Sequence, residues 1–309
     1  METEEILVQA YAKINLTLEI LSKREDGYHD IVSVMQSISL CDRLRIRALP
    51  GDIMVHCSDH GVPSGRENIA YKAADRLKNA LGVKKGVWIS IEKGIPSAAG
   101  LGGGSSDAAA VLRGLNRLWK AGLSKDELIA LAKDVGADVP FFIQGGTALA
   151  QGIGERLKKL SPIPTLWFVL VKPPFGVSTK EVYEKFDSME KKIKSRPHHQ
   201  RLLAALYRGE LKNASINMVN MLEEVTVSLH PQVKEVIDAL KQAGCEKVLM
   251  CGSGPTVCGI VSSRERAFEI RRRLVSQNLP WKIYIAHTVD HGSIIISRGK
   301  GGKIWERKD

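Results

Sequence analysis

Polar and apolar residues alternate along the first predicted strand, residues 6–20, and the alternation is regular from residue 12 onward. Lys13, Asn15, Thr17 and Glu19 share one face of this strand, and aliphatic residues occupy the other. A period of two predicts a strand with one buried face. Because a polar stripe on a strand usually faces water, solvent exposure is the plain expectation for these four side chains.

Further along the chain, short apolar runs and helical periods follow one another, separated by glycine and proline. Strands are predicted at residues 31–40, 43–49, 87–92, 147–150, 166–172 and 281–287, and as two pieces around a glycine turn within 248–261. Helices are predicted at residues 68–81, 108–118, 124–135, 179–186, 201–207, 213–224, 231–244 and 264–278. Groups of strands with helices between them predict an α+β protein.

A polar stretch with two prolines, residues 157–164, separates the two halves of this pattern. We therefore expect an N-terminal domain over residues 1–160 and a C-terminal domain over residues 161–309. A chain of 309 residues is long enough for two such domains, each with its own core.

A glycine-rich segment, residues 95–107, runs directly into the helix predicted at 108–118. Glycine allows close backbone approach and positive φ, and a helix N-terminus presents unpaired N–H groups and the positive end of its dipole. The segment therefore predicts a phosphate site rather than a flexible linker. It is neither a P-loop nor a G-x-G-x-x-G motif, because Ser105 stands where the third glycine would be.

The composition is that of an ordinary globular protein, with 44% apolar and 26% charged residues. No apolar run approaches the roughly 18 residues that span a bilayer, and the acidic N-terminus lacks a signal-peptide pattern. We expect a cytoplasmic protein with no membrane partner. The five cysteines are odd in number and contain no C-x-x-C pair, which indicates buried reduced thiols rather than disulfides or zinc ligands.

A net charge of +11 admits a nucleic-acid partner, but the basic residues are spread along the chain. A positive field of this kind also draws in a polyanionic small molecule. Phosphoryl transfer would need a cation and a carboxylate beside the phosphate site. Lys13 and Asp138 are candidates, although each taken alone is more simply an exposed strand lysine and a helix-end aspartate.

Four segments taken together change that balance: residues 12–16, 96–106, 136–140 and 252–254. In this order they resemble the GHMP kinases, the small-molecule kinases named for galactose, homoserine, mevalonate and phosphomevalonate. With D-G-Y-H at residues 26–29, the set is most similar to the branch whose substrate is a cytidylylated methylerythritol of the non-mevalonate isoprenoid route. The resemblance spans about residues 8–262 through five separated motifs, so chance is a poor explanation.

The resemblance implies a two-domain fold, with an ATP-binding N-terminal domain similar to one found in a ribosomal protein and a C-terminal α/β substrate domain. It implies ATP and Mg²⁺ as cofactors, a small-molecule substrate, no nucleic acid, and a monomer or weak homodimer. Asp138 would accept the proton of the substrate 2-hydroxyl, and Lys13 would orient Asp138 and stabilise the developing charge.

The remaining site residues follow from the same resemblance. Substrate binding would involve Asn15, Tyr28, His29, Thr179 and Tyr183, with Tyr28 and His29 holding cytosine by stacking and edge hydrogen bonds. Ser106 is also the candidate metal ligand. The ATP phosphates would lie against Pro96, Gly100, Leu101, Gly102, Gly103, Gly104, Ser105 and Ser106.

Two alternatives remain open. Another GHMP kinase, of the homoserine or mevalonate type, would share the glycine segment but has no base to stack, so the motif at residues 26–29 argues against it. An RNA-binding protein with the same N-terminal fold would suit the basic charge. RNA binding, however, gives no reason for the combination of Lys13, Asp138 and the glycine segment.

Overall fold

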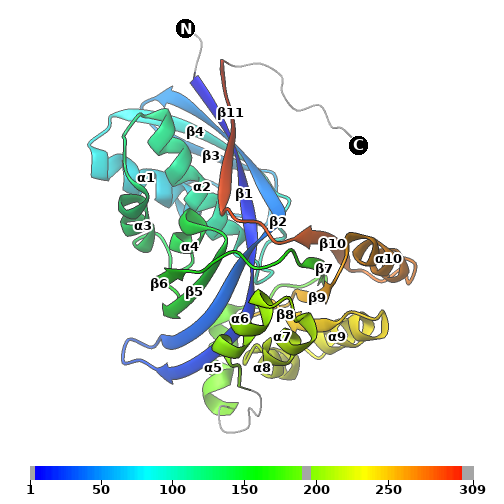
Figure 1. Cartoon of the computed structure of the whole chain (residues 1–309). Coiled ribbons are helices and arrows are strands. Elements are labelled where there is room, and N and C mark those ends of the chain that lie inside the picture. The colour runs from blue at the N-terminus through cyan, green and yellow to red at the C-terminus, as the bar shows by residue number, and fades with distance from the viewer. Residues whose placement is uncertain (1–3, 190–195, 301–309) are drawn as a thin grey trace.

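The computed structural model describes residues 4–189 and 196–300, which form two sheets with helices against them (Figure 1). The first sheet has the order β11-β1-β2-β4-β3, and β5 and β6 extend it from β2. The second sheet has the order β10-β7-β9-β8. The strands of the first sheet are β1 (Glu4–Lys23), β2 (His29–Pro50), β3 (Ile53–Cys57), β4 (Lys85–Glu92), β5 (Thr147–Gly152), β6 (Arg156–Lys159) and β11 (Ser293–Lys300). Those of the second are β7 (Trp167–Lys172), β8 (Lys247–Met250), β9 (Val257–Val261) and β10 (Lys282–His287).

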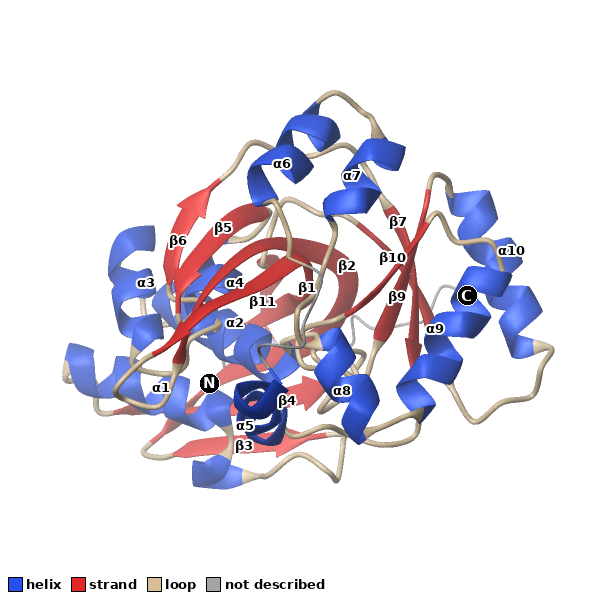
Figure 2. Cartoon of the chain, turned by 90° about the horizontal axis from the view of Figure 1, so that it is seen from below, coloured by secondary structure: helices blue, strands red, loops and turns tan. Residues whose placement is uncertain are grey.

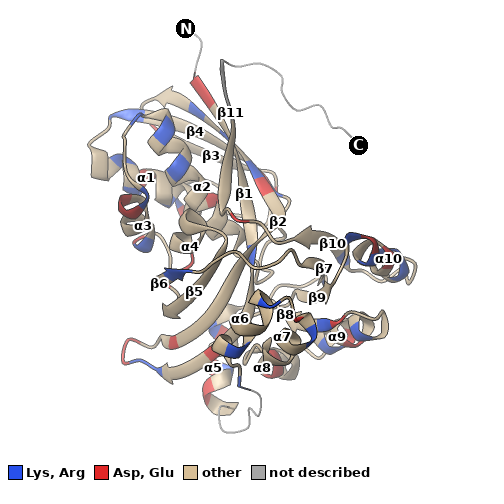
Figure 3. Cartoon of the chain, in the orientation of Figure 1, with Lys and Arg blue, Asp and Glu red and all other residues tan. Residues whose placement is uncertain are grey.

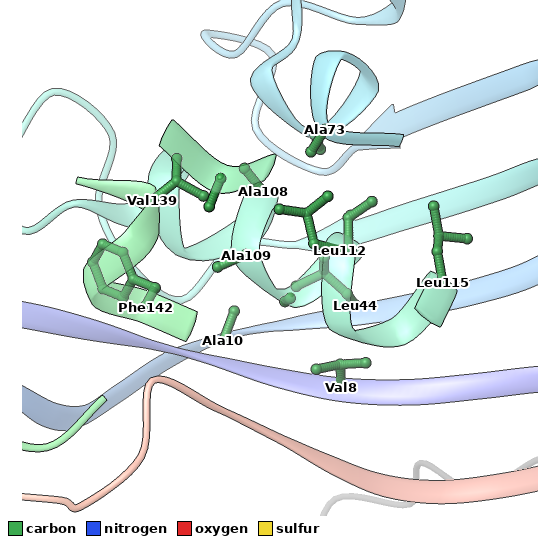
Figure 4. Close-up of a cluster of buried hydrophobic side chains, with 14 of the residues drawn as sticks. Val8, Ala10, Leu44, Ala73, Ala108, Ala109, Leu112, Leu115, Val139 and Phe142 are labelled. Atoms are coloured by element: carbon green, nitrogen blue, oxygen red, sulfur yellow. The ribbon is translucent and has the colours of Figure 1, made fainter. Parts of the chain in front are cut away.

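Helices cover one face of the first sheet and enclose its main core (Figure 4). Alanines and leucines of α2, among them Ala109 and Leu112, lie against Val8 and Ala10 of β1 and Leu44 of β2. Small side chains on this face bring the helix axis close to the sheet, which fixes where the helix begins relative to β1. The covering helices are α1 (Ile69–Leu81), α2 (Gly103–Leu118), α3 (Lys125–Lys133) and α4 (Val139–Gln144), with a 3₁₀ turn at Gly65–Glu67.

The second sheet is buried on both faces. One face meets the middle of β1 in a core that joins Ile14 and Leu16 to Phe168 and Ile260. The other face packs against helices, as the view from below shows (Figure 2). The helices of this half are α5 (Thr179–Met189), α6 (His199–Tyr207), α7 (Leu211–Asn217), α8 (Glu223–Leu229), α9 (Gln232–Gln242) and α10 (Arg264–Val275).

The α+β class is confirmed, but several predicted elements are wrong in detail. The strands predicted at 31–40 and 43–49 form one continuous strand, β2, because a register shift near Cys41 bends it without ending it. The helix predicted at 213–224 is interrupted between α7 and α8. Asn220 lies in the interruption, where its side chain donates to the carbonyls of Met250 and Gly252 and its backbone bridges to Leu18.

The expectation that the polar stripe of β1 faces water is wrong for its central residues. Lys13, Asn15 and Thr17 are 6%, 2% and 0% exposed. The aliphatic face of the strand already packs on the second sheet. The polar face is covered by the glycine segment, where Gly102 approaches the Lys13 side chain. The Val34 N–H of the neighbouring strand β2 donates to Thr17 Oγ1. Both faces are therefore enclosed, and the polar face is satisfied by hydrogen bonds.

The division at residue 160 stays a prediction, and the chain beyond it does not stay in the second sheet. β11 pairs antiparallel with β1 and so returns to the first sheet (Figure 1). The sequence pattern did not predict β11, nor did it predict β3, β6 or α4.

Three general expectations bear on the chemistry. All five cysteines are free thiols. Among the described residues, no helix is both long and apolar enough to cross a membrane. Basic residues lie next to acidic ones on α3, α9 and α10 rather than forming a continuous stripe (Figure 3), and ion pairs such as Lys234–Asp238 and Arg266–Glu269 result.

Candidate active site

A cavity of about 1150 Å³ lies where the two halves of the molecule meet. Its walls come from β1 and the turn after it, the glycine segment, the start of α4, the start of α5 and the turn at residues 252–254. The cavity is therefore built from segments scattered over most of the chain. The predicted site residues that line it are Lys13, Asn15, Tyr28, His29, Pro96, Gly100, Leu101, Gly102, Gly103, Gly104, Ser105, Asp138, Thr179 and Tyr183.

The glycine segment presents the N-terminus of α2 to this cavity. Gly102 is the N-cap residue with φ 71°, and no side chain caps the helix. The first intrahelical bond is donated by Ser106 to the Gly102 carbonyl. The N–H groups of Gly103, Gly104 and Ser105 consequently have no acceptor within the helix, which is the arrangement that binds anions.

Gly100 fixes the segment against the second glycine turn. Its φ is +75°, and a Cβ there would overlap the Cys251 carbonyl oxygen. Gly252 approaches from the other side, since a Cβ added at Gly252 would lie 3.1 Å from the Gly100 carbonyl oxygen. Lys13 also donates its backbone N–H to the Leu101 carbonyl at 3.0 Å. The segment is thereby tied to β1 and to the second half of the molecule by backbone contacts.

Ser106 is not among the residues that line the cavity, and the phosphate and metal contacts expected of it stay predictions. Its side chain is fully buried and donates to the Tyr11 carbonyl at 2.6 Å. Ser105, the residue before it, lines the cavity, and successive side chains of a helix are turned by about 100° from one another. The Ser106 hydroxyl therefore faces β1 and anchors α2 on the sheet.

Lys13 and Asp138 face each other across the cavity, with 3.6 Å between Nζ and Oδ2. Lys13 donates to Asn15 Oδ1 at 2.8 Å, and Asn15 donates to Ser33 Oγ at 2.7 Å. Asp138 is the N-cap residue of α4, yet its side chain makes no capping bond. The helix-end explanation for Asp138 is thus not what the geometry shows, because the carboxylate turns to Lys13 instead.

The aromatic residues lie at the other end of the cavity. Tyr28 is 60% exposed in the turn between β1 and β2, where its N–H donates to Asp26 Oδ1. This backbone hydrogen bond lowers the pKa of Asp26, with the Arg24 guanidinium adding to the effect. The His29 ring is buried and stacks on Tyr183, with 5.0 Å between ring centroids. One exposed ring and one buried stack therefore line the same mouth of the cavity.

Tyr183 and Thr179, both on α5, line the cavity together with the Lys13–Asp138 pair. Burial raises the pKa of the Tyr183 hydroxyl, and the charge of Asp138 adds to that shift. Thr179 Oγ1 and Ser253 Oγ are 2.8 Å apart, so α5 is held to the second glycine turn. The structure thus brings the predicted substrate residues of the second half, Thr179 and Tyr183, into the same cavity as Lys13.

A buried charge network beneath the glycine segment was missed from the sequence. Lys93 Nζ lies 2.5 Å from Asp42 Oδ2 and 2.8 Å from Asp107 Oδ2. Burial alone would lower the pKa of Lys93, but the charges of Asp107 and Asp42 outweigh it and raise that pKa. Asp42 also accepts from the N–H groups of Gly94 and Ile95, which holds the entry to the segment. No spacing links these residues, so no sequence signal indicated them.

Asp107 and Lys93 both line the cavity, whereas Asp42 lies behind them. Burial, together with the charge of Asp42, raises the pKa of the Asp107 carboxyl well above its usual range. Its Oδ1 is buried and has no hydrogen-bond partner within the described chain. Across residues 4–189 and 196–300, no three His, Cys, Asp or Glu side chains form a group that would hold a metal alone.

Comparison with known proteins places these features in a family. The model of the GHMP kinase N-terminal domain matches residues 68–146, and that of the GHMP kinase C-terminal domain matches residues 202–280. A 4-diphosphocytidyl-2-C-methyl-D-erythritol kinase of Pelotomaculum thermopropionicum is 48% identical over 269 residues, covering 87% of this chain and 93% of the relative. The enzyme of the same name from Caldicellulosiruptor saccharolyticus is 45% identical over 270 residues, covering 87% and 92%.

Solved structures agree with these relatives. A crystal structure of 4-(cytidine 5'-diphospho)-2C-methyl-D-erythritol kinase superposes with a TM-score of 0.77 at 37% identity, covering 92% of this chain and 99% of the other. Homoserine kinase from Cytophaga hutchinsonii gives a TM-score of 0.74 at 19% identity, covering 94% and 97%, and so shares the fold.

Proposed function

The chain belongs to the 4-diphosphocytidyl-2-C-methyl-D-erythritol kinase family of the GHMP kinases, and on that premise we propose that its cavity transfers the γ-phosphoryl group of ATP to the 2-hydroxyl of 4-diphosphocytidyl-2-C-methyl-D-erythritol. Membership of this family makes the chain an ATP-using kinase of a small molecule. The observation that carries the proposal is the position of the Lys13–Asp138 pair. It lies between the open N-terminus of α2 and the aromatic residues at 28 and 29, within one cavity.

The chemistry requires a held triphosphate and a deprotonated hydroxyl. The N–H groups of Gly103, Gly104 and Ser105 bind phosphate oxygens at the N-terminus of α2. Asp138 takes the proton as the substrate oxygen forms its bond to the γ-phosphorus, and the bond to the bridging oxygen of ATP breaks to release ADP. Lys13 holds the Asp138 carboxylate and offsets negative charge in the transition state.

Mg²⁺ is expected to accompany ATP, where it would neutralise negative charge on the phosphates. Magnesium bound through substrate phosphates needs only one or two protein carboxylates, so the lack of a three-residue cluster in the described chain agrees with this mode. Asp107 fits the role through its unpartnered Oδ1 at the second turn of α2. The charge of the ion, added to that of Lys93, would favour the ionised form of this carboxyl against the burial that raises its pKa. We assign Asp107, rather than Ser106, as the residue that would hold the ion.

Tyr28 is expected to hold the cytosine ring by stacking. A base stacked on one aromatic ring is worth about 1–3 kcal/mol, so Tyr28→Ala raises the KM of the cytidylylated substrate about 5- to 150-fold. The KM of ATP stays near its wild-type value, because Tyr28 lies at the opposite end of the cavity from the glycine segment. Steady-state kinetics with each substrate varied in turn measures both. A larger change in the KM of ATP than in that of the other substrate would place the turn in the wrong subsite.

Gly100→Ala tests the glycine segment. The new methyl group needs the strained φ of +75° and overlaps the Cys251 carbonyl, so the segment must move away from the second glycine turn. We expect ATP affinity, measured by calorimetry, to fall at least about tenfold, or about 1.4 kcal/mol. Gly122→Ala is the matched control, since Gly122 has φ +72° with nothing within 4 Å of its Cβ. The control should lose only about 1–2 kcal/mol of stability from its backbone and bind ATP normally. Equal ATP affinity in both variants would argue against a phosphate role for the segment.

An assay of ATP consumption tests the function as a whole. The protein is offered the cytidylylated methylerythritol, homoserine and mevalonate in parallel, with Mg²⁺ present. Turnover with the first alone is expected, and turnover with homoserine or mevalonate instead would refute the assignment. The cytoplasmic location and the monomeric or weakly dimeric state stay predictions from the sequence.

A further inference from the structure

One contact at the mouth of the cavity is not used by the reaction described above. His29, at the start of β2, places Nε2 2.7 Å from Asp187 Oδ1 on α5. The second oxygen of the same carboxylate accepts from Lys23 Nζ at 2.6 Å. Asp187 thus joins the β1–β2 turn to α5, and each of its oxygens has one donor.

The ring of His29 is held in a single orientation. Tyr183 stacks on it with an interplanar angle of 30°, and Phe186 meets it edge-on at 6.0 Å between centroids. Its side chain is 5% exposed. A 180° turn of the ring would keep both ring contacts but lose the Nε2 hydrogen bond to Asp187, so that bond fixes which nitrogen faces α5.

The charge state of Asp187 then sets which nitrogen of His29 carries the proton. Burial alone would raise the pKa of Asp187, but hydrogen bonds from Lys23 and His29 outweigh it and lower that pKa. An ionised carboxylate only accepts hydrogen bonds, so Nε2 must be the donor. In the neutral ring Nδ1 is then an acceptor. The described chain makes no hydrogen bond to Nδ1, and His29 lines the cavity.

We infer that Asp187 is a positioning residue that fixes the Nε2–H tautomer of His29, so that Nδ1 accepts a hydrogen bond from the exocyclic amino group of a cytosine and discriminates against uracil. The inference rests on the proposed function for the identity of the base. Cytosine carries an amino donor at position 4, whereas uracil carries a carbonyl acceptor there, as thymine does. If uracil were bound, the Nδ1 lone pair would face the carbonyl at position 4, and neither acceptor would have a donor. Sites built to hydrogen-bond one ligand strongly reject an analogue that cannot form the bond.

The alternative is that Asp187 only fastens α5 to the β1–β2 turn. A fastening role affects any nucleotide in the cavity to the same extent, because it changes the shape of the mouth and not the polarity of one atom. A positioning role changes the ratio between two bases. The two roles therefore separate in the preference for CDP over UDP, even where both variants bind less tightly overall.

The test uses the whole chain and needs no turnover. ¹⁵N spectra of ring-labelled wild-type protein report the His29 tautomer, and calorimetry gives the dissociation constants of CDP and UDP. We expect the Nε2–H tautomer and a preference for CDP. In Asp187→Asn, whose amide can also donate, we expect the tautomer to become mixed and the CDP preference to fall about tenfold. Asp238→Asn, which alters an exposed ion pair on α9, is the control and should change neither quantity.

The outcomes are decisive in each direction. A wild-type His29 protonated at Nδ1 overturns the inference, whether or not the variant folds. So does an Asp187→Asn protein that loses CDP and UDP affinity equally. If the CDP preference depends on Asp187 but the cytidylylated methylerythritol is not phosphorylated, the inference stands and the proposed reaction fails. If the substrate is phosphorylated but Asp187→Asn leaves the base preference unchanged, the proposed reaction stands and the inference fails.

Discussion

Asp138→Asn is expected to lower kcat by about 10²–10⁴-fold, the usual effect of removing a positioned general base. The amide keeps the shape of the carboxylate but cannot take the proton from the substrate hydroxyl. Because the proton moves only as the transition state forms, the KM values of ATP and of the second substrate should change little. Steady-state kinetics at saturating concentrations of each substrate measures these quantities.

Asp134→Asn is the matched control for this variant. Asp134 lies four residues earlier and pairs with Arg76 at 2.7 Å, with 54% of its side chain exposed. Exposed ion pairs contribute little to stability, so this protein should keep wild-type kcat. An Asp138→Asn protein that is folded and retains kcat near wild type would remove Asp138 from the reaction.

Lys13→Met is expected to lower kcat by about 10²–10³-fold, in the range found when one donor to transition-state charge is removed. Methionine keeps most of the aliphatic stem and removes the ammonium that lies 3.6 Å from Asp138 Oδ2. Asn15 Oδ1 also loses its donor, so the orientation of that side chain is expected to loosen. Lys72→Met, at an exposed position of α1 outside the cavity, is the control and should be neutral.

The double variant makes the pairing of the two residues testable. If Lys13 acts through Asp138, kcat of the double variant should lie within a few-fold of kcat of the slower single variant. The effects of residues that act as a unit are not additive. Fully multiplicative losses would instead mean that Lys13 and Asp138 contribute separately.

Local sequence determined the parts of the site that depend on neighbouring residues. The alternation in β1 put Lys13 and Asn15 on one face, and the glycine run ahead of an alanine-rich helix set an uncapped N-terminus. Backbone preference and side-chain period act over a few residues, so they can be read from the chain directly. The same reasoning failed for β11, whose place beside β1 follows from a pairing between the two ends of the chain.

The tertiary structure alone decided which way the polar groups face and which of them meet. The face of β1 that carries Lys13 is buried because a second sheet covers the opposite face and the glycine segment covers this one. Asp42 and Lys93 are 51 residues apart, and His29 and Asp187 are 158 apart. Such contacts depend on how sheets and helices stack, and no local period encodes that stacking. Ser106 shows the same limit within one helix: its motif position predicts a ligand contact, but the rotation of α2 on the sheet turns its hydroxyl to Tyr11.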